Sequence, residues 1–265
     1  MKGMEKIKMR VAAKIEKNER LALVIYFFIA ALIVLCLVRQ AYNHEYFNAL
    51  LCLFSLILIS LPSIIERKTR VELPQALEII VVCFVFGAEI LGEIENFYYH
   101  IPIWDSLLHI STGCLAAAVG FGAIDLINKH IKRISMTPLF VVAVAFCFSM
   151  TIGVIWEFFE YGADRFLKTD MQKDTVVSEI ASVSFDQTHR NISVKVQGIE
   201  KTVIYDAQGG AIAEIDGFLD IGLADTMKDL LVNMLGALLF CIYGYLYLYR
   251  RDKYKFIEHI IIKKR

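Results

Sequence analysis

Six apolar segments, each about as long as a membrane is thick, constrain this chain more than any other feature of its sequence. A helix needs roughly 20 mostly apolar residues to cross ~30 Å of hydrocarbon at ~1.5 Å per residue. The segments that meet this requirement are 21–38, 47–65, 74–94, 104–124, 138–160 and 228–249. We therefore expect an all-α polytopic membrane protein with six transmembrane helices.

Composition agrees with this class of protein. Hydrophobic residues make up 57% of the 265 residues, above the ~45–50% that is usual for soluble domains. The 28 basic residues balance the 28 acidic ones, so the chain offers no basic surface for nucleic acid. All six cysteines fall inside the apolar segments, which indicates small buried or lipid-facing residues and not a disulfide framework.

The distribution of Lys and Arg predicts the orientation of the chain, because basic residues near helix ends stay in the cytoplasm. Successive connections alternate between many and few of them: seven in 1–20, one in 39–46, three in 66–73, none in 95–103 and three in 125–137. A further seven lie in the tail 250–265, and six lie in the long loop 161–227. Long loops are translocated largely regardless of charge. We expect both termini to be cytoplasmic in a bacterial inner membrane, with five spans in 21–160 and the sixth in 228–249.

Three segments lie outside the predicted spans. Residues 1–20 place Met4, Ile7, Val11 and Ile15 at helical spacing among lysines, as in a basic amphipathic helix on the cytoplasmic membrane surface. Residues 250–265 form a basic cytoplasmic tail. The loop 161–227 is expected on the extracytoplasmic side.

The long loop carries a strand pattern. Thr175–Phe185 and Asn191–Gln197 alternate apolar and polar residues, and Thr202–Tyr205 and Ala211–Ile215 flank the turn signal Gln208-Gly209-Gly210. This pattern predicts a small β-hairpin or meander inserted between the last two spans. A hairpin alone is marginally stable, so the region 174–220 is a candidate binding segment for an extracytoplasmic protein partner.

Acidic residues inside the spans are the main functional signal. Intramembrane charges are costly and normally face the bundle interior or a wet cavity. Seven acids lie in the apolar segments, whereas the one base there, at a span's edge, is Lys228, so buried salt bridges do not account for them. These acids are Glu78, Glu89, Glu93, Asp105, Glu157, Glu160 and Asp229.

Except for Glu78, these acids fall near the predicted extracytoplasmic ends of four helices. Their spacings of three or four residues place them, with His109, Asp164, Asp225 and Asn233, on shared helix faces. Small residues after His109, from Gly113 to Gly120, predict close helix packing. We expect a pocket open to the extracytoplasmic face, lined by Asp105, His109, Glu157, Glu160, Asp229 and Asn233. Asp164, Asp225, Glu89 and Glu93 support it, and Trp104 and Trp156 fit an aromatic belt at that interface.

Three motifs resemble one protein family. They read Trp104-Asp105-x3-His109-x3-Gly113, Trp156-Glu157-x2-Glu160-x3-Asp164 and Asp225-Thr226-Met227-x-Asp229-x3-Asn233-x2-Gly236-Ala237. Together they are similar to the YjdF-like bacterial inner-membrane proteins and, more distantly, to VanZ-like membrane proteins, over about residues 70–245. The resemblance implies the fold and the location. It implies no activity, because the YjdF-like family has none established.

Oxygen ligands with one imidazole suit a divalent ion such as Mg, Mn or Zn. The first hypothesis is therefore a metal-assisted hydrolase or transferase acting on a lipid-linked or envelope substrate. Asp105, His109, Glu157, Glu160 and Asp229 are its candidate ligands, with His109 a ligand or general base and Glu157 or Glu160 a ligand or acid. Two alternatives stay open: a proton- or cation-coupled transporter, and a non-enzymatic receptor or assembly protein that uses the exported loop.

Overall fold

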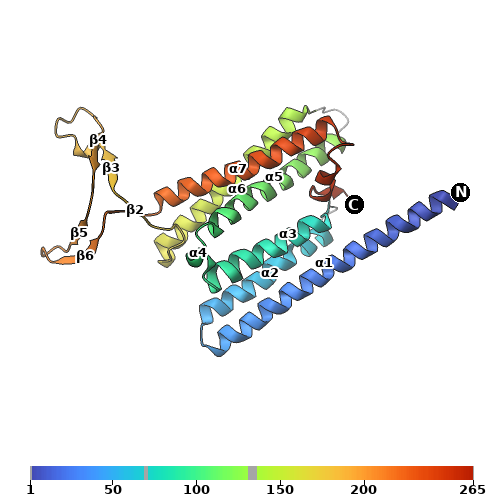
Figure 1. Cartoon of the computed structure of the whole chain (residues 1–265), viewed down its shortest axis with the longest axis horizontal. Coiled ribbons are helices and arrows are strands. Elements are labelled where there is room, and N and C mark those ends of the chain that lie inside the picture. The colour runs from blue at the N-terminus through green and yellow to red at the C-terminus, as the bar shows by residue number, and fades with distance from the viewer. Residues whose placement is uncertain (1, 69–70, 131–135, 265) are drawn as a thin grey trace. The chain divides into compact units, whose positions relative to one another are not determined.

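The chain is mostly helical in a computed structural model that describes residues 2–68, 71–130 and 136–264 (Figure 1). Five helical segments among these residues are long and apolar enough to cross a membrane. They are Arg20–Tyr42, Tyr46–Lys68, Trp104–Asn128, Pro138–Leu167 and Leu223–Tyr249. Membrane-spanning helices imply a lipid bilayer as the environment of this protein.

By the density of its internal contacts the chain divides into two units. The first comprises Met1–Gly153 and Val232–Arg265, and the second comprises Val154–Leu231. Both divisions fall inside continuous helices, α6 (Pro138–Leu167) and α7 (Leu223–Tyr249).

The first unit begins with three neighbouring helices, α1 (Lys2–Tyr42), α2 (Tyr46–Lys68) and α3 (Gln75–Val85) (Figure 1). Their facing sides bury an apolar cluster that includes Ile33, Cys52, Ile59 and Val82. Many other apolar side chains of α1 and α2 are exposed. That distribution is typical of helices that face lipid, which is as apolar as the side chains it covers. The predicted apolar stripe of the first 20 residues lies outside the residues whose side chains are described.

The predicted third span, 74–94, is folded as two helix types in succession. The α3 helix runs directly into the π-helix η1 (Phe86–Ile94), with Val85 and Phe86 both in right-handed helical backbone. The Glu95 N–H donates to the Ile90 carbonyl, the five-residue spacing that defines a π-helix, at 2.9 Å. This segment is for that reason not among the five long helices.

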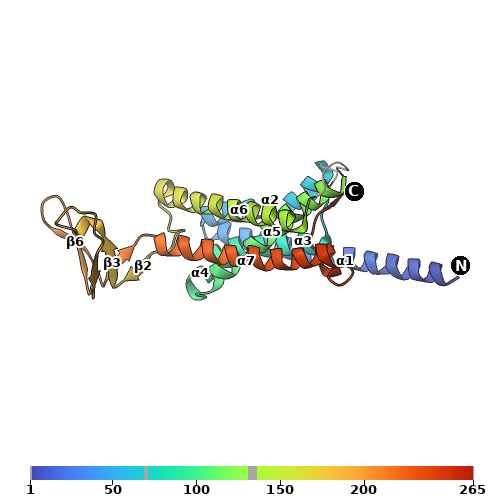
Figure 2. The same ribbon diagram turned by 90° about the horizontal axis from the view of Figure 1, so that it is seen from above.

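A second group of helices follows the short α4 (Phe97–His100). It consists of α5 (Trp104–His130), α6 and α7, whose first-unit parts share a core that includes Phe121, Val141 and Ala237 (Figure 2). A Cβ on Gly113 of α5 would lie 2.0 Å from the Asn233 carbonyl oxygen of α7, and one on Gly236 would lie 2.0 Å from the Ile110 oxygen. Only glycine permits this approach, so the small residues of α5 do bring two helix backbones together.

The chain's C-terminal segment packs against one end of this unit. After α7, the 3₁₀-helix η3 (Lys255–His259) buries Ile257 in the core shared by α5, α6 and α7. The strand β8 (Lys263–Lys264) then pairs with β1 (Val71–Glu72), which follows α2. At the same end of this unit, Arg251, which follows α7, forms an ion pair of 3.4 Å with the buried Asp125 of α5.

The second unit contains a small region of strands between α6 and α7, which confirms the predicted insertion. Three antiparallel pairs form it: β2 (Thr175–Val177) with β7 (Phe218–Asp220), β3 (Glu179–Ser182) with β4 (Val194–Gln197), and β5 (Thr202–Tyr205) with β6 (Ala211–Ile215). A 3₁₀ turn, η2 (Val183–Phe185), follows β3. The predicted turn joins β5 and β6, with Gly209 at φ +83°.

Two helices extend further than hydropathy alone indicates. The sequence predicts the end of the fifth span at residue 160 and the start of the sixth at 228, whereas α6 continues to Leu167 and α7 begins at Leu223. Polar turns at the helix ends account for the difference, because they are helical without being apolar. At the start of α7, the Asp220 carboxylate accepts a hydrogen bond of 2.6 Å from the Ala224 N–H, as a helix cap does.

Candidate functional site

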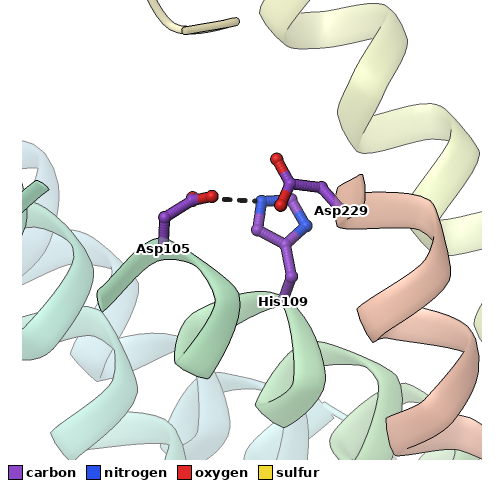
Figure 3. A group of neighbouring side chains, drawn as sticks. All are labelled: Asp105, His109 and Asp229. Carbon is purple, nitrogen blue, oxygen red and sulfur yellow. Dashed lines mark ion pairs between the residues drawn. The ribbon is translucent and has the colours of Figure 1, made fainter. Parts of the chain in front are cut away.

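The first two candidate residues lie one turn apart near the start of α5. The His109 Nε2 atom lies 3.5 Å from Oδ1 of Asp105, and the imidazole is buried (Figure 3). The four-residue spacing places both side chains on one helix face. A carboxylate beside one ring nitrogen orients the imidazole and leaves the other nitrogen for another contact.

Two acids of α6 lie in the second unit and are buried. Glu157 is 5% exposed and Glu160 is 6% exposed, although they lie on a helix with many exposed apolar side chains. The indole Nε1–H of Trp156 donates to Oε1 of Glu160 at 2.8 Å. Trp156 thus fixes one oxygen of this carboxylate.

The first turns of α7 carry the other acids. Asp229 is 1% exposed, and the Lys228 ammonium lies 3.5 Å from its Oδ1 and 2.6 Å from Oδ1 of Asp225. The expectation that salt bridges play no part is therefore wrong at this point. The Lys228 side chain is 44% exposed, so its ammonium stays partly solvated while it offsets the negative charge of two buried carboxylates.

Ligand atoms from two sets of these side chains lie close enough to share a metal ion. One atom each from Asp105, His109 and Asp229 lie within 4.8 Å of one another, and Figure 3 shows both carboxylates beside the imidazole ring. The same spacing holds for His109, Glu157 and Glu160. His109 belongs to both sets, and every member except Asp105 is buried. Five candidate residues thus occur in these two sets.

The predicted supporting residue Asn233 lies one turn beyond Asp229 on α7 and is 1% exposed. Its amide Nδ2 atom lies 3.7 Å from the Met150 sulfur. A Cβ on Gly153 would come within 2.7 Å of the same nitrogen. Among the described residues its Oδ1 atom has no hydrogen-bond partner. Asn233 therefore fills the close contact between α6 and α7, and neither metal-ligand set depends on it.

Glu89 and Glu93 lie in the π-helix η1, outside both sets of ligand atoms. Glu89 is half-buried and Glu93 is exposed. A spacing of four residues is close to one turn in a π-helix as it is in an α-helix, so these two acids still lie near one face of η1. Trp104 contacts the same segment, since its indole N–H donates to the Gly87 carbonyl at 3.2 Å.

Asp164 and Asp225 hold the backbone that connects α6 to the strand region. The Asp164 carboxylate accepts hydrogen bonds from the Met171 and Gln172 N–H groups at 2.7 and 2.8 Å. The Asp225 carboxylate accepts one from the Lys173 N–H at 2.8 Å. Both acids are thus engaged in local structure within the second unit. Sequence spacing alone does not reveal these bonds, because they depend on how residues 169–173 fold back.

Comparison with known proteins agrees with the motifs. The family model described as "Predicted membrane protein (DUF2238)" matches residues 21–250. An uncharacterized protein of Thermotoga maritima is 26% identical over 106 residues, which cover 40% of this chain and 53% of that protein. The chain therefore spans about half the length of this relative. No solved structure matches the chain. The family match confirms the predicted membership of a membrane protein family of unknown function.

Proposed function

The chain belongs to the DUF2238 family of predicted membrane proteins, and we propose that it is a metal-dependent membrane enzyme. Its active centre would be the acidic, His-containing group around His109. The observation that carries this proposal is the closeness of ligand atoms from Asp105, His109 and Asp229, and from His109, Glu157 and Glu160, within 4.8 Å in each set. The proposed substrate is lipid-linked or part of the cell envelope.

The proposed topology has six spans with both termini in the cytoplasm. In this arrangement α3 and η1 together form the third span. Two observations within the first unit support it: β1, just before α3, pairs with the C-terminal β8, and Arg39 at the end of α1 pairs with Glu95 just after η1. The segment 75–94 would thus run from the end where the C-terminus lies to the end where α1 finishes. The basic residues of 1–20 and 250–265 support the cytoplasmic assignment of both termini.

The donor chemistry favours a divalent cation. Carboxylate oxygens are ligands for Mg and Mn, and an imidazole with carboxylates also suits Zn. A divalent ion near Asp229, Glu157 and Glu160 would stabilise the charged forms of these buried carboxylates, in addition to the ammonium of Lys228.

When bound, the metal would lower the pKa of a water molecule and polarise a substrate oxygen. The chain's own residues would prepare the reaction. Asp105 orients the His109 imidazole as a ligand or general base, and Trp156 holds Oε1 of Glu160 and so restrains this carboxylate. Glu157 is then available as a ligand or as the acid that protonates a leaving group. The surrounding apolar helices would exclude bulk water.

Metal analysis of purified protein tests this proposal. We expect close to one Mg, Mn or Zn ion per chain, and a lower metal affinity by roughly 10–100-fold in Trp156→Phe, which loses the hydrogen bond to Glu160. Trp104→Phe is the matched control, because its indole N–H donates to Gly87 and not to a candidate ligand. Asp105→Ala and Glu157→Ala should abolish binding. If no ion co-purifies and added metal leaves the Tm unchanged, the proposal is wrong.

Transport of a proton or cation is the second candidate, and the π-helix favours it. Transporters place ion sites on interrupted membrane helices, and η1 interrupts α-helical geometry at the half-buried Glu89. In proteoliposomes, Glu89→Gln should abolish a gradient-driven flux that the exposed Glu93→Gln retains. Absence of flux in the wild-type protein would count against this candidate.

A further inference from the structure

A groove of about 590 Å³ lies among α1, α2 and α3 of the first unit. This volume is within the range of ~300–1,000 Å³ that is typical of small-molecule sites. None of the candidate metal ligands lines it. Its walls are mostly apolar, with Ile25, Phe27, Ile59 and Val82 among them.

The charged residues of the groove lie toward one end, together with Gln75. Arg67 is in the last turn of α2, and Gln75 and Glu78 are in the first turn of α3. The apolar Ile59 lies eight residues from Arg67 on α2, ~12 Å along the axis, and Val82 lies seven residues from Gln75 and four from Glu78 on α3, ~10 and ~6 Å along the axis at 1.5 Å per residue. The groove therefore has a charged mouth and an apolar depth, as a site for a lipid requires.

Two opposite charges line the mouth, and neither makes an ion pair within the part of the chain that is described. Arg67 is exposed and Glu78 is half-buried. A second hollow of about 500 Å³, lined by α1, η1 and α4, also contains an arginine and a glutamate, Arg39 and Glu95. Those two side chains pair with each other. In the first groove, by contrast, both charges are available to a ligand.

Polar contacts join the two helices α1 and α2 that line the groove below its mouth. The Tyr26 hydroxyl of α1 lies 3.3 Å from Oγ of Ser60 on α2, and that hydroxyl in turn donates to the Leu56 carbonyl at 2.8 Å. Pro62, which is buried in α2 and lines the groove, has no N–H for the helical ladder. The Tyr26 and Ser60 hydroxyls therefore line the groove below its charged mouth.

We propose that this groove binds one phospholipid whose headgroup carries both a phosphate and a primary amine, as phosphatidylethanolamine does. The phosphate would bind the Arg67 guanidinium, whose planar fork matches phosphate oxygens, and the ammonium would bind Glu78. One acyl chain would follow the apolar wall. A lipid with a phosphate and no amine would leave Glu78 without a cation beside a second negative charge, so the groove selects against it. This inference does not depend on the proposed enzyme activity.

Native mass spectrometry of the full chain tests the proposal. Protein taken from bilayer discs with equal fractions of phosphatidylethanolamine and phosphatidylglycerol should retain one phosphatidylethanolamine, with a preference of about tenfold. Glu78→Gln should remove the preference between the two lipids. Arg67→Gln should weaken retention of both.

Two neighbouring charges that do not line the groove provide matched controls. Lys68→Gln and Glu72→Gln should retain the wild-type lipid and the wild-type preference. Equal retention of the two lipids by the wild-type protein would overturn the proposal, and this measurement stands even if a variant fails to fold. Loss of the preference in Glu72→Gln to the same degree as in Glu78→Gln would overturn it as well.

Discussion

Replacing Gly113 by alanine should force α5 and α7 apart just below the candidate site. The new Cβ would lie 2.0 Å from the Asn233 carbonyl oxygen, whereas real Cβ contacts essentially never fall under 3.0 Å. The obstacle is backbone, so no side-chain rotation relieves it, and the two helices must separate by about 1 Å. Overpacking of this kind costs ~1–3 kcal/mol.

Gly162→Ala is the matched control for this substitution. Gly162 also lies inside a helix, α6, but its Cβ would meet nothing within 4 Å. There alanine should stabilise the protein by up to ~1 kcal/mol, because alanine favours helix more than glycine does. The two variants should therefore differ by ~1–4 kcal/mol, which corresponds to roughly 2–16 °C in Tm.

The assay is thermal unfolding of both variants in the same detergent, followed by metal analysis. Gly113 lies one turn from His109, so a shift of about 1 Å should also lower the metal affinity of the Gly113→Ala protein. The Gly162→Ala protein should bind metal as the wild type does. If the two variants unfold at the same temperature, the close packing of α5 on α7 is refuted. If Gly113→Ala unfolds early but binds metal normally, the site does not depend on that packing.

Two further predictions concern other parts of the molecule. The pKa of Asp186 is lowered to about 2, because its carboxylate accepts hydrogen bonds from the Thr188 hydroxyl and from nearby backbone N–H groups. The stability that this carboxylate contributes is present above its unfolded pKa of ~3.9 and is lost as the pH falls toward 2. The protection of the Thr188, Arg190 and Ile192 amides against hydrogen exchange, relative to the unstructured rate at the same pH, should therefore fall over that range, and Asp186→Asn should show low protection at every pH. Arg251→Gln should lower the stability by ~1–3 kcal/mol, because it removes an ion-pair partner of the buried Asp125. The control Arg250→Gln, at the adjacent exposed arginine, should leave the Tm unchanged, and equal Tm values for the two variants would show that the Arg251–Asp125 ion pair does not stabilise the fold.

Most of the fold could be predicted from the apolar segments and the strand pattern of the sequence. Five of the six predicted spans correspond to long helices, because a run of about 20 apolar residues has few other stable forms. The predicted strands Thr202–Tyr205 and Ala211–Ile215 have the bounds of β5 and β6, since the turn at Gly209 sets the register of a hairpin. The π-helix could not be predicted, because hydropathy does not distinguish it from an α-helix.

The candidate site could be predicted only in part from the sequence. Helical spacing grouped Asp105 with His109 and Glu157 with Glu160, because residues on one helix face need no tertiary information. Glu89 and Glu93 lie outside both ligand sets, and spacing along one helix does not say which neighbours that helix face meets.

The roles of two polar residues depend on tertiary contacts that spacing does not encode, because Asp164 and Asp225 accept hydrogen bonds from the folded-back connection after α6. Lys228 instead pairs with two acids of its own helix. One signal for Lys228 was present, because it lies three residues after Asp225, a spacing at which opposite charges meet on a helix.

The most direct test of the central claim is an anomalous-scattering map of crystals grown with Mn or Zn. We expect one strong peak within bonding distance of the His109 imidazole and of carboxylate oxygens from its two sets of neighbours. The peak should disappear in His109→Gln and remain in His100→Gln, whose imidazole belongs to neither set. A well-ordered site with no peak at His109, or a metal bound elsewhere in both variants, would show that His109 does not hold a metal.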